Sequence, residues 1–159
     1  MPPTLPLLEL PFLAELTAQR RDIHAHPELA FNESRTADLV ARELQRYGLE
    51  VHAGIAKTGV VGVLRAGNSS KMIGLRADMD ALPLCELNEF PHHSRHPGKM
   101  HACGHDGHTA MLLGAARYLA LHPDFDGVAV FIFQPAEESE GGAAVMIEEI
   151  GRASCRERV

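Results

Sequence analysis

The chain has 159 residues, 45% of them hydrophobic and 23% charged, a balance typical of one soluble globular domain. Its 15 basic and 21 acidic side chains give a net charge of −6 without a basic cluster, which argues against a nucleic-acid partner. No apolar run approaches the roughly 20 residues of a membrane span, and the N-terminus lacks signal-peptide features. The three cysteines are no disulfide framework, so we expect reduced thiols and a cytoplasmic location.

The first 48 residues predict two helices. Apolar residues recur at helical spacing from about Phe12 to His24, and Pro27 interrupts this first helix. A second helix is expected between Asn32, as its N-cap, and Gly48, as its C-terminal stop. Its apolar stripe consists of Ala37, Val40, Leu44 and Tyr47.

Strand patterns follow. The segment "LEVHAGI" (49–55) predicts a short strand, and "GVVGVLRA" and "KMIGLRAD" flank "GNSS" in the pattern of a β-hairpin. Residues 81–104 show no periodicity, and such a long loop within a compact domain is usually functional. The sequence therefore predicts three strands within residues 49–78, followed by a long functional loop.

A helix is expected from about Asp106 to the residue before Pro123. "GVAVFIFQ" (127–134) is an unbroken apolar strand of the kind that is buried on both faces of an α/β sheet. The loop "PAEESEGG" leaves this strand, and "AAVMIEEI" begins another helix. The last nine residues, "GRASCRERV", change in character, and Gly151 should break the helix. We interpret them as a non-native cloning tail, with an ordinary basic tail as the alternative.

The segment "MHACGHDGHTAM" (100–111) is rich in metal-binding side chains. Cys103 and His105 stand two residues apart before a predicted helix, so both can face one ion, and thiolate with imidazole suits zinc. On its own this pair is a weak signal. A nucleophilic cysteine with its histidine base is the competing interpretation.

Two acidic segments follow predicted strands. In "QPAEES", Glu137 and Glu138 follow the buried strand, where one carboxylate can coordinate a metal while the other accepts a proton. A solvated acidic turn is the alternative. In "GLRADMDALP", Asp78 or Asp80 can orient a ligand histidine, or simply form a strand-end turn.

Together these segments resemble the M20 metallopeptidase family, and within it the amidohydrolase branch of hippurate hydrolases, N-acyl-amino-acid amidohydrolases and auxin-conjugate hydrolases. The resemblance covers roughly residues 12–150 and rests on five segments in the expected order. They are "RRDIHAHPELAFNE", "TGVVGVL", "GLRADMDALP", "HPGKMHACGHDGHTAMLLGAA" and "VFIFQPAEE". The second, fourth and fifth together are highly specific to the family.

The resemblance implies an α/β fold, namely an αβα zinc-peptidase-like metallohydrolase domain with a mixed sheet. It implies that Cys103, His105 and Glu138 are metal ligands, with the cysteine bridging two ions, and that Glu137 is the general base. Two divalent ions, Mn²⁺ or Zn²⁺, are expected in each full-length subunit. Many M20 peptidases have a ligand histidine where Arg76 stands, so this position favours the amidohydrolase branch.

Family members are about twice this length or more, and they take further histidine ligands from beyond the double glutamate. They also carry an inserted dimerisation domain, so full-length relatives are expected to be homo-oligomeric. We therefore expect an N-terminal extension (1–11), the N-terminal part of the catalytic domain (12–150) and the tail (151–159).

The implied reaction is hydrolysis of the amide bond of a small-molecule N-acyl amino acid, such as hippurate, to a carboxylic acid and an amino acid. The isolated fragment is expected to be inactive because part of the ligand set is missing. Three alternatives are a metallopeptidase or aminoacylase acting on small peptides, a non-catalytic metal-binding module, and a non-catalytic interaction fragment.

Overall fold

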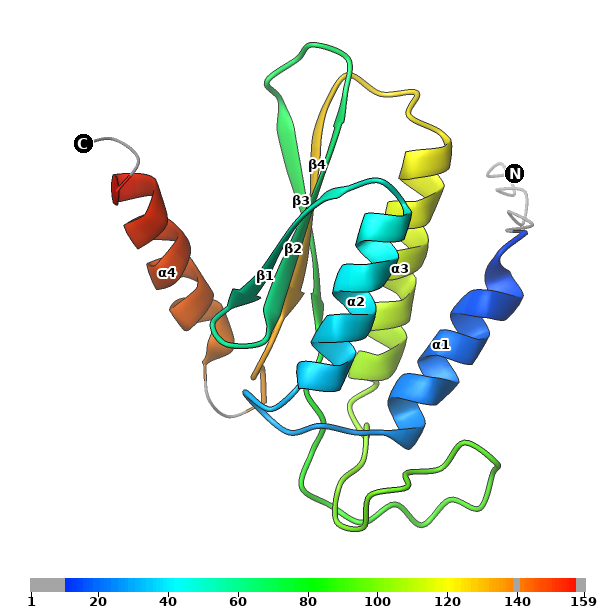
Figure 1. Cartoon of the computed structure of the whole chain (residues 1–159). Coiled ribbons are helices and arrows are strands. Elements are labelled where there is room, and N and C mark those ends of the chain that lie inside the picture. Colours follow the sequence, from blue (N-terminus) through cyan, green and yellow to red (C-terminus); the bar gives the residue numbers. More distant parts are fainter. Residues whose placement is uncertain (1–10, 139–140, 157–159) are drawn as a thin grey trace, which may run out of the picture.

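The computed structural model describes residues 11–138 and 141–156, with side chains up to residue 151. Within these ranges the chain forms four helices and one four-stranded sheet (Figure 1). In chain order the elements are α1 (Leu13–Ala25), α2 (Ser34–Arg46), β1 (Glu50–Ile55), β2 (Gly59–Ala66), β3 (Met72–Asp78), α3 (His105–Leu121), β4 (Gly127–Gln134) and α4 (Gly142–Arg156). In the described ranges no helix has both the length and the apolarity to cross a membrane.

The sheet is mixed, as predicted, with the strand order β1-β2-β4-β3. β2 is antiparallel to β1 and to β4, whereas β3 runs parallel to β4. The predicted hairpin of residues 59–66 and 71–78 is therefore wrong, because β4 lies between these two strands. β3, α3 and β4 instead form a crossover unit, which is the connection that parallel neighbours require.

The apolar pattern of β4 explains its central position. Phe131 and Phe133 project to one face of the sheet and are fully buried, while Val130 and Ile132 pack on the other face. A strand that is apolar on both faces is stabilised most between two neighbours. The "GNSS" segment does not close a hairpin, and the carboxylate of Asp126, just before β4, accepts hydrogen bonds from two of its backbone N–H groups.

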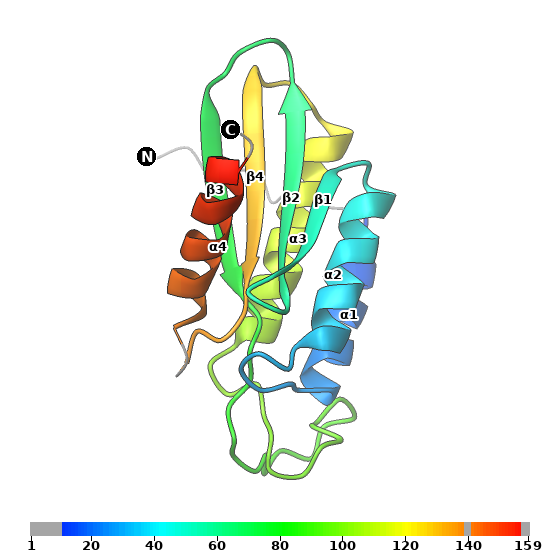
Figure 2. The same ribbon diagram turned by 60° about the vertical axis from the view of Figure 1, so that its left-hand side comes forward.

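Helices cover both faces of the sheet, which confirms the αβα architecture. In both views α1, α2 and α3 lie on one side of the sheet and α4 lies on the other (Figures 1 and 2). The larger core fills the space between the sheet and the first three helices. Its fully buried side chains include Val40, Leu44, Leu113, Phe131 and Phe133. A smaller cluster around Val61 and Met146 holds α4 against the opposite face.

The start of α2 differs from the prediction. Glu33, not Asn32, is the N-cap residue, and its side chain makes no capping hydrogen bond. The carboxylate of Glu28 instead accepts the N–H groups of Arg35 and Thr36 at 3.0 and 2.8 Å. These are among the N–H groups that a helix leaves without an internal partner, so Glu28 accepts the hydrogen bonds that the side chain of an N-cap residue usually accepts.

The predicted end of α2 is confirmed. Gly48 has φ +85°, its N–H donates to the carbonyl of Gln45, and the N–H of Leu49 donates to the carbonyl of Leu44. This pair of bonds is a Schellman motif, for which glycine is suited because it has no Cβ to oppose a left-handed conformation.

The long loop of residues 81–104 contains no helix or strand, as predicted, apart from one bridge between Leu82 and Met100. Beneath it lies a buried polar cluster in which the ring nitrogens of His24 approach Asp106 at 2.8 Å and Glu86 at 3.1 Å. His24 is thus a satisfied internal histidine. The cluster ties the loop to α1 and α3.

The expectation for Gly151 is wrong, because α4 continues through it to Arg156. A glycine costs a helix only about 1 kcal/mol, which the packing of the preceding turns can offset. The non-native origin of residues 151–159 stays a prediction. Residues 1–10 of the expected N-terminal extension lie outside the described residues.

Candidate metal centre

The predicted site residues converge at one end of the sheet. β3 and β4 are parallel, so their carboxyl ends lie at the same edge, where ligands usually bind in α/β folds. Asp78 ends β3, and the double glutamate follows β4. His105 opens α3 directly after Gly104, whose φ of +84° turns the chain into the helix. One potential ligand atom from each of Cys103, His105 and Glu138 lies within 4.8 Å of the others.

His105 is the centre of this arrangement. Its Nε2 lies 3.6 Å from Asp78 Oδ1, 3.7 Å from Glu138 Oε1 and 3.9 Å from Glu137 Oε2. These distances exceed that of a hydrogen bond, so one imidazole nitrogen faces three carboxylates without bonding to any of them. Burial lowers the pKa of His105, but its hydrogen bond to Asp80 and the charges of Asp78 and Asp80 raise the pKa overall.

Asp80 connects the histidine to the double-glutamate loop. His105 Nδ1 lies 2.8 Å from the Asp80 carbonyl oxygen and 3.3 Å from Oδ1, while Oδ2 accepts the N–H of Glu138 at 3.0 Å. Burial alone would raise the pKa of this carboxyl, but hydrogen bonds from His105 and from the loop N–H groups lower it overall. Of the two strand-end aspartates, Asp80 is therefore the one that holds the other ring nitrogen of His105.

The donor set fits a divalent cation. Glu138 Oε1 is buried without a hydrogen-bond partner among the described residues, a costly arrangement that a cation beside His105 Nε2 would relieve. Sulfur, nitrogen and carboxylate oxygen together suit zinc, and the carboxylates admit manganese. The ligand roles of Cys103, His105 and Glu138 stay predictions.

The alternative of a nucleophilic Cys103 has no support from the geometry. Its side chain is exposed, and the neighbouring Glu138 carboxylate raises the pKa of the thiol. A cysteine nucleophile requires the opposite shift, since the thiolate is the reactive form.

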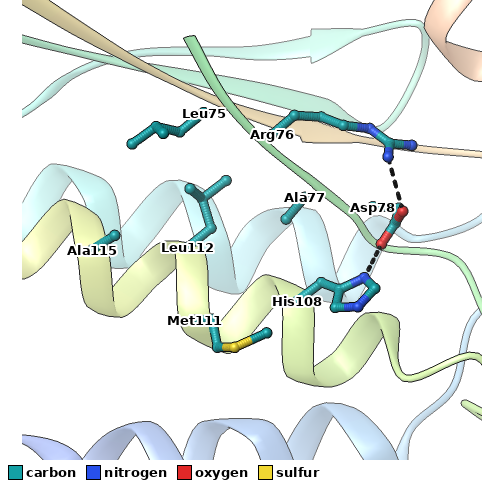
Figure 3. Close-up of a pocket in the computed structure, with 8 residues that line it drawn as sticks. All are labelled: Leu75, Arg76, Ala77, Asp78, His108, Met111, Leu112 and Ala115. Carbon is teal, nitrogen blue, oxygen red and sulfur yellow. Dashed lines mark hydrogen bonds and ion pairs between the residues drawn. The ribbon is translucent and has the colours of Figure 1, made fainter. Parts of the chain in front are cut away.

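Asp78 also takes part in a second group, with His105 and His108. His108 Nδ1 lies 2.7 Å from Asp78 Oδ1, and the Arg76 guanidinium lies 3.2 Å from Oδ2 (Figure 3). A permanently charged guanidinium cannot coordinate a metal, so Arg76 is not a ligand. These side chains border a cavity of about 430 Å³ beside α3.

Sequence patterns missed several residues around the centre. His108 had no assigned role, and its approach to Asp78 depends on the packing of α3 on β3. His101 is buried with neither ring nitrogen hydrogen-bonded to a described residue, and burial lowers its pKa to about 4. Glu33, whose carboxylate accepts the Ala136 N–H at the start of the double-glutamate loop, has no sequence signal beyond its position at a helix start.

The family model of peptidase family M20/M25/M40 matches residues 74–158, more than half of the chain. The chain belongs to this family. The match begins in β3, covers every predicted site residue and extends over most of the tail. Membership confirms the resemblance that was read from the motifs.

Relatives within the M20 family confirm the amidohydrolase branch. The chain is 58% identical over 130 residues to a hippurate hydrolase of Campylobacter jejuni, which covers 82% of this chain and 34% of the relative. It is 47% identical over 136 residues to an N-acyl-L-amino acid amidohydrolase of Geobacillus stearothermophilus, covering 84% and 37%. It thus spans about a third of the length of these relatives.

A solved structure supports the fold. The YXEP protein of Bacillus subtilis, described as a dinuclear metal-binding peptidase of the M20 family, superimposes with a TM-score of 0.81 at 41% identity. The aligned region covers 85% of this chain and 38% of that protein. The αβα arrangement described above is therefore that of part of an M20 catalytic domain.

Proposed function

We propose that this chain is the N-terminal part of a metal-dependent amidohydrolase that cleaves the amide bond of N-acyl amino acids. The observation that carries the proposal is the convergence of three carboxylates on His105 Nε2 at 3.6–3.9 Å. Hippurate hydrolase and N-acyl-L-amino acid amidohydrolase among the relatives indicate the substrate class.

Cys103, His105 and Glu138 would hold a divalent ion, Zn²⁺ or Mn²⁺. A bound ion of this kind polarises an amide carbonyl and makes water more acidic. Two ions in the full-length subunit are part of the proposal, supported by the dinuclear description of the Bacillus subtilis relative. Asp80 would fix the tautomer of His105. A proton on Nδ1 directed at the Asp80 carbonyl leaves the Nε2 lone pair free to coordinate the ion.

Glu137 is the proposed proton carrier. Its carboxylate reaches to 3.9 Å from His105 Nε2 while its side chain stays 41% exposed, so it borders the ligand group and remains open to water and substrate. It would accept a proton from the attacking water and pass it to the leaving amine nitrogen. The C–N bond then breaks, and a carboxylic acid and an amino acid are released.

The experiment measures hydrolysis of hippurate, with added Mn²⁺ or Zn²⁺, by two proteins. One is the 159-residue protein, and the other is a version extended at its C-terminus to the length of the family members. The extended protein should turn over hippurate, and Glu137→Gln should lower its kcat by about 10²–10⁴-fold with unchanged metal content. The 159-residue protein should be inactive, since it holds only part of the ligand set. Turnover by this fragment at the rate of the extended protein would contradict the proposal.

Peptidase activity on small peptides is the second candidate function. It is favoured by a relative named thermostable carboxypeptidase 2 from Saccharolobus solfataricus, which is 49% identical over 133 residues. Parallel assays of the extended protein with hippurate and with dipeptides that have a free amino terminus separate the two. Metal retention without hydrolysis of either substrate would indicate a metal-binding module. We further propose that the full-length enzyme is cytoplasmic and homo-oligomeric.

A further inference from the structure

Glu33 is a fully buried carboxylate whose two oxygens bind two loops that are distant in the sequence. Oε1 accepts the backbone N–H of Ala136 at 2.9 Å, and Oε2 accepts the hydroxyl of Thr58 at 2.6 Å. The side chain does not cap α2, because Glu28 takes the free N–H groups of that helix. A buried carboxylate is costly unless its hydrogen bonds are made, so the contacts of Glu33 with these loops stabilise its burial.

Ala136 immediately precedes the double glutamate. It is fully buried and has φ +53°, a left-handed conformation that a residue with a Cβ adopts only at a cost. Its N–H is held by Glu33, and its carbonyl accepts the N–H of Gly142 at 2.9 Å. Ala136, the residue before Glu137, is therefore held by hydrogen bonds on both sides in a conformation that is unfavourable for a residue with a Cβ.

A second carboxylate holds the other end of the same short segment, since the N–H of Glu138 donates to Asp80 at 3.0 Å. Glu137 thus lies between two backbone N–H groups, each bound by a buried acidic side chain. We propose that Glu33 is a positioning residue, whose carboxyl group fixes the backbone before Glu137 and so directs Glu137 and Glu138 toward His105. This inference rests on the proposed function of that site.

The test uses the 159-residue protein with Co²⁺ as the probe, because a thiolate bound to Co²⁺ gives a charge-transfer absorption that reports Cys103. Glu33→Asp keeps the charge but is one methylene shorter, so it cannot reach both donors, and it should weaken Co²⁺ binding about tenfold or more. Glu33→Gln keeps the reach without the charge. Its amide oxygen can accept the Ala136 N–H and its amide nitrogen can donate to Thr58, so affinity should stay within about threefold.

Val40→Ala is the matched control for lost stability. Val40 is fully buried in α2 within the larger core cluster, and it belongs to neither group of potential metal ligands. The substitution should therefore lower the urea midpoint without changing Co²⁺ affinity. Thr58→Val removes only the second hydrogen bond of Glu33 and should give a smaller loss than Glu33→Asp. It also keeps the test decisive if Glu33→Asp does not fold.

The outcomes are distinguishable. Unchanged affinity in both Glu33→Asp and Thr58→Val would overturn the positioning role while leaving the proposed site intact. An equal loss in Val40→Ala and Glu33→Asp at matched urea midpoints would also overturn it. If the unsubstituted protein gives no thiolate absorption with Co²⁺, the proposed site fails, and this inference fails with it.

Discussion

Glu86 should make the stability of this protein depend strongly on acid. It lies in the long loop with its side chain 2% exposed, and its carboxylate is bonded by His24, by Asn88 and by the backbone N–H of Ser94. Burial alone would raise the pKa of this carboxyl, but the hydrogen bonds and the His24 contact lower it from 4.5 to about 2.

The magnitude follows from this difference. Each pKa unit corresponds to about 1.4 kcal/mol, so a pKa lowered from 4.5 to about 2 corresponds to roughly 3.5 kcal/mol that ionised Glu86 should contribute to the free energy of unfolding. Because the pKa in the folded state is below its ordinary value, this contribution is complete above pH 4.5 and is lost as the pH falls toward 2.

Urea unfolding of the unsubstituted protein and Glu86→Gln between pH 5 and pH 2.5 measures the effect. The difference in unfolding free energy should be largest at pH 5 and shrink steadily with acidification. Any part of the difference that does not change with pH reports the hydrogen-bond geometry that Glu86→Gln loses. Glu89→Gln, an exposed glutamate in the same loop, is the control and should match the unsubstituted protein throughout. A Glu86→Gln difference that stays constant over this range would refute the reasoning.

Three further substitutions, two of them with a matched control, test the site and the packing. Asp80→Asn replaces one of the two side-chain oxygens that face His105 Nδ1 and the Glu138 N–H by an amide nitrogen, which cannot accept. It should weaken Co²⁺ or Zn²⁺ binding about 10–100-fold, whereas exposed Asp38→Asn should not, as metal titration would show. Gly142→Ala places a Cβ 1.9 Å from the Pro135 carbonyl oxygen and should cost about 1–3 kcal/mol in urea unfolding. Gly107→Ala, which meets open space within α3, should be neutral or slightly stabilising. Phe131→Ala, in the fully buried core, should cost about 3–5 kcal/mol, and a loss below 1 kcal/mol would contradict the packing described.

Local sequence was enough for the elements and the family. Helical spacing located α1, α2 and α3 within a residue or two, and the unbroken apolar run located β4, because these signals depend on neighbours a few residues apart. The segments around Cys103 and Glu137 identified the family, since both motifs are contiguous in the chain.

The tertiary structure alone decided which strands pair and which acids serve the site. β4 separates β2 from β3 because burying both of its faces outweighs closing a short hairpin, and nothing local to residues 59–78 signals this. Asp78 and Asp80 look equivalent in the sequence, but the turn after β3 directs Asp80 at His105 Nδ1. Glu33 meets the Ala136 N–H only when the fold brings the start of α2 beside the loop after β4, a contact between residues far apart in the chain.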